Sequence, residues 1–249
     1  MKSVQERLKA GRDPKKPCIT VCVGTGCLAY GTRKLVDNFR EELLKRNLAG
    51  KIDFRTSGCH GFCERGPMVV ISPEKIFYQR VGLADAGEII DKTVLTGEII
   101  DRLLYVDPQT GEKYVHEDDV PFYKKQTRLV FGQNSKVDPE SMDDYLAIGG
   151  YSALGKALTG MKPEEIIREV IKANLRGRGG GGFPAGWKWD ETRKASGEPK
   201  YIICNADEGD PGAYMDRSLL EGNPHLVLEG MIIGAYAIGS SEGYIYVRN

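Results

Sequence analysis

The chain lacks an excess of charge of either sign. Its 249 residues carry 35 lysines and arginines against 35 aspartates and glutamates, and they contain no long basic run. Proteins that bind nucleic acid usually gather positive charge on one face or helix, because phosphate contacts supply much of their affinity. We therefore expect no nucleic-acid partner.

Long hydrophobic runs are missing as well. The longest apolar stretch, LVLEGMIIGAYAIG at residues 226–239, is interrupted by Glu229 and falls short of the ~20 residues of a bilayer helix. The first 16 residues, MKSVQERLKAGRDPKK, are polar and contain no apolar core of a signal peptide. We expect no direct membrane insertion and a cytoplasmic location.

Side chains for acid/base or nucleophilic catalysis are scarce. The chain has 3 histidines, and no acid/base dyad or Ser/His/Asp set stands out. His116 lies in a polar segment among acidic residues, where a solvated histidine is the expected state. We predict no catalytic side chain, so any chemistry would come from a cofactor.

Four of the 6 cysteines form two close pairs, Cys22 with Cys27 and Cys59 with Cys63, each in a glycine-rich loop after an apolar run. A 2Fe-2S cluster takes two thiolates per iron, so two pairs on adjacent loops match its demand. The pattern indicates an iron–sulfur site and a role in moving electrons.

Structural zinc and disulfides are two other uses of four cysteines. Structural zinc favours pairs with two intervening residues; the intervals here are looser, but zinc stays open as an alternative. Disulfides need an oxidising compartment and are set aside. Cys18 and Cys204 lie in apolar runs and are expected to be small buried hydrophobes rather than ligands.

The first part of the chain has the pattern of a small α/β domain. Residues 17–23 and 51–57 predict strands, and residues 32–48 predict an amphipathic helix. Residues 67–81 predict a hairpin around Pro73, and a last helix is expected from near Leu83. This order is typical of a thioredoxin-like domain, in which a βαβ unit and a hairpin share one sheet.

The segments CVGTGCLAYGT and SGCHGFCERGPMV resemble the thioredoxin-like 2Fe-2S ferredoxin module of NADH-linked redox complexes. The resemblance implies that Cys22, Cys27, Cys59 and Cys63 are the four cluster ligands. We expect residues 1–14 to be an extension, residues 15–104 this domain, and residues 105–126 a polar linker without sustained periodicity.

A second constellation is the segment RGRGGGGFPAGWKW at residues 176–189. So many glycines indicate a backbone that must approach a ligand closely, and the flanking cations and aromatic rings suit a phosphate-bearing aromatic molecule. The formal G-x-G-x-x-G match is weak, because it follows a helical segment and soon meets Pro184. Residues 150–157 imitate a Walker loop, but Ala157 replaces its Ser or Thr, so a nucleotide triphosphatase is rejected.

The third feature is the acidic loop NADEGDPG at residues 205–212, which follows a predicted buried strand. Carboxylates there can accept hydrogen bonds from ribityl or ribose hydroxyls and disfavour an extra ribose phosphate. A hard-cation site and a solvated turn with helix-capping carboxylates remain alternatives.

Together, RGRGGGGFPAGWKW and CNADEGDPGAYMDRSLLEGNPHLVLEGMIIGAYAIG resemble the flavin- and NADH-binding subunit of respiratory complex I and its soluble relatives. The resemblance covers residues 127–249 and implies the first part of a Rossmann-like FMN/NADH-binding domain. Asp210 stands where the complex I pattern usually has glutamate, which leaves its contact with the nicotinamide nucleotide open. The residues implied in FMN and NAD(H) binding are Gly177, Arg178, Gly179, Gly180, Phe183, Lys188, Asn205, Asp207, Glu208 and Asp210.

The fusion of both modules resembles the β subunits of NAD-linked FeFe-hydrogenases, NADP-reducing hydrogenases and NAD-dependent formate dehydrogenases. An electron-bifurcating hydrogenase subunit is the first expectation. Formate dehydrogenase diaphorase and complex I-type NADH dehydrogenase are its alternatives. The implied partners are a catalytic iron–sulfur subunit, a small 2Fe-2S subunit and, as a further possible partner, ferredoxin.

The end of the chain carries an expectation of its own. GYIYVRN at residues 243–249 predicts a buried parallel strand beside the strand at residues 200–204, and two strands are few for a covered sheet. We expect a fragment or one half of a split subunit, with a 4Fe-4S centre in the missing part or in partners. If the chain is complete, a non-catalytic electron-transfer or assembly module is the competing hypothesis. The sequence leaves open NAD against NADP, hydrogen against formate, the oligomeric state, and whether FMN binds without the missing part.

Overall fold

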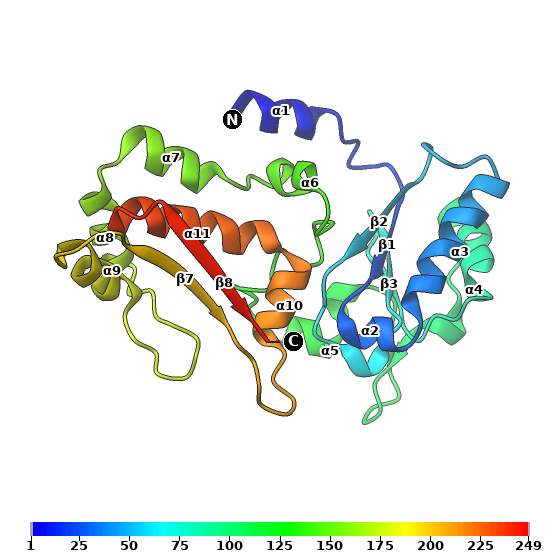
Figure 1. Cartoon of the computed structure of the whole chain (residues 1–249). Coiled ribbons are helices and arrows are strands. Elements are labelled where there is room, and N and C mark those ends of the chain that lie inside the picture. The colour runs from blue at the N-terminus through cyan, green and yellow to red at the C-terminus, as the bar shows by residue number, and fades with distance from the viewer. Residues whose placement is uncertain (1, 249) are drawn as a thin grey trace. The chain divides into compact units, whose positions relative to one another are not determined.

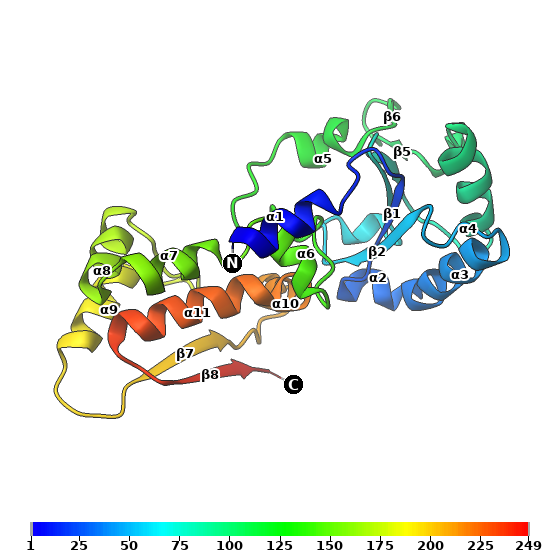
Figure 2. The ribbon, with the colours of Figure 1, turned by 90° about the horizontal axis from the view of Figure 1, so that it is seen from above.

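The computed structural model describes residues 2–248, which form two compact units (Figures 1 and 2). The N-terminal unit comprises residues 8–144 together with 218–223, and the C-terminal unit comprises residues 2–7, 145–217 and 224–248. The division falls within α1 (Lys2–Ala10), α6 (Met142–Ala147) and α10 (Met215–Gly222).

The N-terminal unit is built on a four-stranded sheet of order β2-β1-β3-β4. Strand β1 (Cys18–Cys22) pairs in parallel with β2 (Asp53–Ser57) and antiparallel with β3 (Val69–Ser72). Strand β3 forms a hairpin with β4 (Ile76–Tyr78). Between β1 and β2 lie α2 (Thr25–Ala29) and the amphipathic α3 (Thr32–Lys45). The predicted order of strand, helix, strand and hairpin is confirmed.

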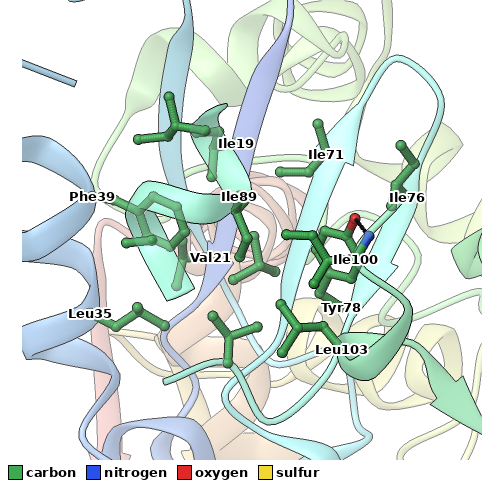
Figure 3. Packing of buried hydrophobic residues seen from close by; sticks show 14 of the residues in the cluster. Ile19, Val21, Leu35, Phe39, Ile71, Ile76, Tyr78, Ile89, Ile100 and Leu103 are labelled. Carbon is green, nitrogen blue, oxygen red and sulfur yellow. Dashed lines mark hydrogen bonds between the residues drawn. The ribbon is translucent and has the colours of Figure 1, made fainter. Parts of the chain in front are cut away.

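Helices cover one face of this sheet. Ile19, Val21, Ile71 and Tyr78 pack there against Leu35 and Phe39 of α3 and against the last helix, which is α4 (Asp85–Glu88) continued by a wider turn at Ile89–Val94 (Figure 3). Burying a large apolar side chain contributes roughly 1.5–3 kcal/mol, so this layer is the main source of the unit's stability. The buried Tyr78 hydroxyl is satisfied because it accepts from the Ile100 amide at 3.0 Å.

Residues 105–126 cover the other face of the sheet. This is the segment that was predicted to be a linker because it lacks a sustained period. It contains β5 (Tyr105–Val106), β6 (Lys113–Tyr114), a 3₁₀ turn (Glu117–Asp119) and α5 (Pro121–Lys124). Phe77 points to this face because alternate residues of a strand point to opposite faces, and Tyr105 and Val120 are buried in one cluster with Phe77 and Phe62. The segment therefore packs on the unit through these side chains. Its short elements carry too few residues to show a period.

The C-terminal unit is mainly helical. It contains α7 (Ser152–Gly160), α8 (Pro163–Lys172), α9 (Ala185–Lys194) and α11 (Pro224–Ile238), with Ala157, Ile166, Ile167 and Ala237 as its buried core. One parallel pair, β7 (Tyr201–Ala206) with β8 (Glu242–Val247), completes it. Within residues 2–248, no helix combines the length and the apolar character that crossing a bilayer requires.

The parallel pairing of β7 with β8 confirms the sequence prediction, but the expected burial is wrong. All six residues of β8 are exposed, and only Ala206 of β7 is fully buried. Parallel sheets are usually covered on both faces. Here β7 is the only strand that pairs with β8 in the described part of the chain, and α11 packs against both strands.

Candidate functional site

The parallel pairing of β1 with β2 brings the two cysteine loops together. Cys22 is the last residue of β1 and stands in register with Ser57, the last residue of β2. Because parallel strands end at the same edge of a sheet, the loops that follow them are neighbours. Cys27 lies in α2 on the first loop, while Cys59 and Cys63 lie on the second.

The four cysteine side chains converge in a largely dry environment. Cys22, Cys27 and Cys59 are 1%, 1% and 6% exposed, and Cys63 is half-buried. The Cys59 and Cys63 sulfurs lie 3.5 Å apart, and the Gly61 amide donates to Cys59 Sγ at 3.2 Å. The Cys22 thiol donates to the Gly58 carbonyl at 3.5 Å.

Glycines make this convergence possible. A Cβ atom on Gly24 would lie 2.7 Å from Cys59 Cβ, and one on Gly26 would lie 2.9 Å from Cys63 Cβ. Real Cβ atoms essentially never approach so closely, so both positions of the first loop need glycine for the second loop to pack on it. Gly66 is equally restricted, because its Cβ would meet Cys27 Sγ at 2.8 Å.

We therefore expect Gly24→Ala to push the two loops apart. Overpacking of this kind costs about 2 kcal/mol of unfolding free energy, and the displaced sulfurs should hold less iron. Thermal melting and iron content of the purified chain would measure both effects. Gly230→Ala is the matched control, since a Cβ there meets no atom within 4 Å and alanine suits a helix interior. Equal iron content in both variants would contradict the expectation.

Local charges and hydrogen bonds differentiate the cysteines. The hydrogen bond from Cys63 lowers the pKa of Cys59 to about 6, aided by the Gly61 amide and the charge of His60, although burial opposes the shift. The pKa of Cys63 is raised, first because it donates to Cys59 and second through burial. The pKa of Cys22 is raised by its hydrogen bond with Cys27 and by burial.

His60 is a residue of this site that sequence reasoning missed. It is 3% exposed, its Nε2 lies 3.0 Å from Ser57 Oγ, and its Nδ1 lies 2.9 Å from Glu117 Oε1. Burial lowers the pKa of His60, but the hydrogen bond with Glu117 and the charges of Cys22 and Cys59 outweigh it, so the net shift is upward. The available signal was its position between two cysteines, in CHGFC.

The donor set fits a 2Fe-2S cluster. Such a cluster spreads its four thiolates over two irons, so each iron requires only a pair. Cys59 and Cys63 form one close pair, and Cys22 and Cys27 form another that shares a hydrogen bond. Among residues 2–248, no group of three or more His, Cys, Asp or Glu side chains is arranged to hold a single metal ion.

The glycine-rich segment of the C-terminal unit is an exposed loop whose two ends are joined by hydrogen bonds. The Gly177 amide donates to the Phe183 carbonyl at 2.9 Å, and Arg176 Nη1 donates to the Gly182 carbonyl at 3.1 Å. Gly180 and Gly182 have φ values of +96° and +58°, which favour glycine. A Cβ on any residue from Gly179 to Gly182 would meet no protein atom within 4 Å, so protein packing does not explain the run.

This loop leads directly into α9, contrary to the expectation based on Pro184. Pro184 precedes the first residue of α9, and there it disrupts no hydrogen bond of the helix. Lys188 follows on α9, with its Nζ 5.8 Å from the centroid of the Phe183 ring. The start of α9 therefore presents backbone amides, a cation and an aromatic ring beside the glycines, a combination suited to a phosphate and a flat ring.

The acidic loop leaves the carboxyl end of β7. Asn205 Oδ1 accepts from the Asp207 amide at 3.0 Å, which fixes the turn. Glu208 accepts from the Asp216 and Arg217 amides at 3.1 and 3.2 Å, so its carboxylate caps α10. Asp207 and Asp210 are exposed. The helix-capping alternative thus describes Glu208, while the other two carboxylates face solvent.

Arg248 is a second residue that sequence reasoning missed. It follows β8, whose carboxyl end lies beside that of β7 because the strands are parallel. A Cβ on Gly209 would lie 1.9 Å from Arg248 Nη1, so the guanidinium occupies the space beside the acidic loop. The signal was the arginine immediately after a strand predicted to be parallel to β7.

The ten residues predicted to bind FMN and NAD(H) thus lie in the glycine-rich loop, the first turn of α9, the end of β7 and the acidic loop, all in the C-terminal unit. Among the contacts described for residues 2–248, none joins the glycine-rich loop to the acidic loop. The groups present fit a flavin nucleotide in kind: amides and cations for its phosphate, Phe183 for a ring, and carboxylates for hydroxyls.

Comparison with known families defines the class of protein. Residues 11–94 match the thioredoxin-like 2Fe-2S ferredoxin model, and residues 170–249 match the Nuo51 FMN-binding domain model. The chain is therefore a thioredoxin-like 2Fe-2S ferredoxin domain followed by a complex I 51 kDa-like FMN-binding domain. Its cofactors are accordingly a 2Fe-2S cluster and FMN.

Individual relatives come from hydrogenases and NADH dehydrogenases. NADP-reducing hydrogenase subunit HndC of Solidesulfovibrio fructosivorans is 51% identical over 125 residues, which are 50% of this chain and 25% of that protein. An NADH-quinone oxidoreductase subunit of Aquifex aeolicus is 57% identical over 108 residues, 43% of this chain and 25% of that protein. The chain thus spans about a quarter of the length of these relatives.

A solved structure similar to part of this chain is the thioredoxin-like 2Fe-2S ferredoxin from Aquifex aeolicus. The two share 26% sequence identity, and the match covers 37% of this chain and 99% of that one with a TM-score of 0.35.

Proposed function

We propose that this chain is an electron-transfer subunit that exchanges electrons between NAD(H), FMN and iron–sulfur clusters within a larger oxidoreductase complex. The observation that carries the proposal is the presence of both cofactor domains in one polypeptide. FMN, when bound, supplies exchange of an electron pair with NADH and of single electrons with iron–sulfur centres.

The side chains have separate roles in this proposal. Cys22, Cys27, Cys59 and Cys63 hold the cluster, and the glycines of their loops let the sulfurs approach one another. Gly177, Arg178, Gly179, Gly180 and Lys188 bind the FMN phosphate, and Asn205, Asp207 and Glu208 bind its hydroxyls. Phe183 and Asp210 face the nicotinamide nucleotide. Because Glu208 already caps α10, its contribution to FMN binding includes fixing the acidic loop.

The particular complex is a finer proposal. We favour a hydrogenase, because HndC, with 51% identity, is a subunit of an NADP-reducing hydrogenase. Electron bifurcation within such a complex is the most specific form of this proposal. A formate dehydrogenase diaphorase or a complex I-type NADH dehydrogenase is the alternative, and a non-catalytic 2Fe-2S module is the competing class. We place the chain in the cytoplasm, where thiols stay reduced for metal binding, with other iron–sulfur subunits as partners.

The visible absorption spectrum of the chain tests this function when the protein is purified without oxygen and measured before and after NADH is added. We expect bands of a cluster and of a flavin, with the flavin contribution bleached by NADH. Cluster bands that do not respond to NADH, without flavin, would favour the non-catalytic module. Iron, sulfide and zinc analysis completes the test, because a colourless zinc protein would overturn the iron–sulfur assignment.

A further inference from the structure

The C-terminal half of α10 packs directly on the second cysteine loop. Residues 218–223 belong to the same compact unit as that loop. A Cβ on Gly58 would lie 2.2 Å from Gly222 Cα, and one on Gly222 would lie 2.4 Å from Asn134 Nδ2. Glycine at both positions therefore lets the backbone of the helix touch the residue that precedes Cys59.

Side-chain hydrogen bonds hold the helix in this place. Asn134 is 1% exposed; its backbone carbonyl accepts from the Gly58 amide at 3.1 Å, and its side-chain Nδ2 donates to the Ser218 carbonyl at 3.0 Å. Thr25 Oγ1, on the first cysteine loop, donates to Glu221 Oε2 at 2.6 Å. Both cysteine loops are thus tied to α10.

This packing places the Ser218 hydroxyl beside the Cys59 sulfur. Ser218 is 7% exposed, so water competes little for its hydroxyl. A side-chain hydrogen bond joins this hydroxyl to the Cys59 side chain. A hydroxyl that donates to a cysteine sulfur stabilises negative charge on that sulfur, and a cluster ligand carries such charge.

We propose that Ser218 donates a hydrogen bond to the Cys59 sulfur and thereby raises the reduction potential of the 2Fe-2S cluster. The proposal rests on the proposed function, in which Cys59 is a cluster ligand. Adding an electron increases the negative charge on the ligand sulfurs, so a hydrogen-bond donor stabilises the reduced cluster more than the oxidised one. Hydrogen bonds to the sulfurs are among the factors that set cluster potentials. Ser218 is thus a positioning residue that acts through Cys59.

A redox titration of the full chain tests the proposal, with the reduced cluster followed by electron paramagnetic resonance. Ser218→Ala should lower the midpoint potential. At the wild-type midpoint, the ratio of reduced to oxidised cluster should fall several-fold, and a tenfold fall would correspond to about 59 mV for one electron. Ser218→Thr retains the hydroxyl and should titrate like the wild type.

Two further measurements separate the hydroxyl from the position of the helix. Thr25→Val removes the tie to Glu221 without touching the Cys59 sulfur, so its midpoint should stay at the wild-type value. The iron–sulfur stretching bands in resonance Raman spectra should shift with deuterium exchange in the wild type, and this shift should be smaller in Ser218→Ala.

The outcomes distinguish this proposal from the proposed function. A wild-type chain without a cluster would overturn both. A Ser218→Ala chain with an intact cluster and an unchanged midpoint would overturn only the role of Ser218. Equal decreases in Thr25→Val and Ser218→Ala would also overturn it, because the position of α10 rather than the hydroxyl would then set the potential. Circular dichroism of each variant checks that the fold is retained.

Discussion

Replacing Cys22 with alanine is expected to remove the cluster from the purified chain. The variant leaves three thiolates for two irons, and one iron then lacks a ligand in a site where Cys22 is 1% exposed and water has little access. Because changes in the outer shell of metal sites already cost 10–100-fold in affinity, loss of a ligand should lower iron content roughly tenfold or more. Visible absorption and iron analysis after anaerobic purification measure the effect.

Cys18→Ala is the matched control, because Cys18 lies on the same strand β1 and is 5% exposed. It stands at the opposite end of the strand from Cys22, in register with Asp53 and Ser72, away from the cysteine loops. We expect this variant to keep its iron and its colour. If both alanine variants lost iron to the same extent, general damage to the sheet would explain the result and the assignment of Cys22 would fail.

Replacing Glu229 with alanine is expected to destabilise the C-terminal unit by about 3 kcal/mol. The Glu229 carboxylate is buried and accepts from the Tyr145 hydroxyl at 2.6 Å and from the Tyr151 and Leu154 amides at 2.8 and 3.0 Å. Removing it leaves buried donors at the start of α7 without an acceptor, and each such donor costs about 1–3 kcal/mol. In a unit of this size, the melting temperature should fall by roughly 10–20 °C.

Calorimetry or circular dichroism melting would measure this fall. Glu169→Ala is the control, since Glu169 is exposed on α8 and such surface changes usually stay within about 0.5 kcal/mol. Glu229→Gln keeps one acceptor oxygen and should lie between the wild type and Glu229→Ala. Similar melting of Glu229→Ala and Glu169→Ala would show that the hydrogen bonds of Glu229 contribute little.

Local patterns predicted most of the elements. The period of Leu35, Phe39 and Leu43 placed α3, and the alternating segments of the first domain placed β1 to β4. The two cysteine pairs and the parallel pairing of β7 with β8 were also visible in the sequence, because spacing and strand propensity are local properties. The resemblance of the glycine-rich and acidic segments supplied the flavin domain, which the family comparison confirms.

Other features depended on contacts between distant residues. Glu229 interrupts an apolar run, and its sequence neighbours give no reason for a buried charge; its partners lie 75 to 84 residues away. The partners of residues 105–126 on the sheet could not be identified from the sequence for the same reason, since Val120 and Tyr105 meet Phe62 and Phe77 only in the folded unit. The exposed β8 departs from expectation because burial is decided by covering layers, not by composition.

The sequence by itself determined the class of this protein. Its signals are two cysteine pairs on glycine-rich loops, followed by a glycine-rich loop and an acidic loop. These signals are visible in the sequence because cofactors demand particular donors at particular spacings. The tertiary structure decided which side chains surround these donors. His60 with Glu117, and Ser218 with the loop of Cys59, are 57 and 159 residues apart along the chain. Hydrogen bonds and burial act through distances in space, so only the folded chain shows which side chains surround the sulfurs.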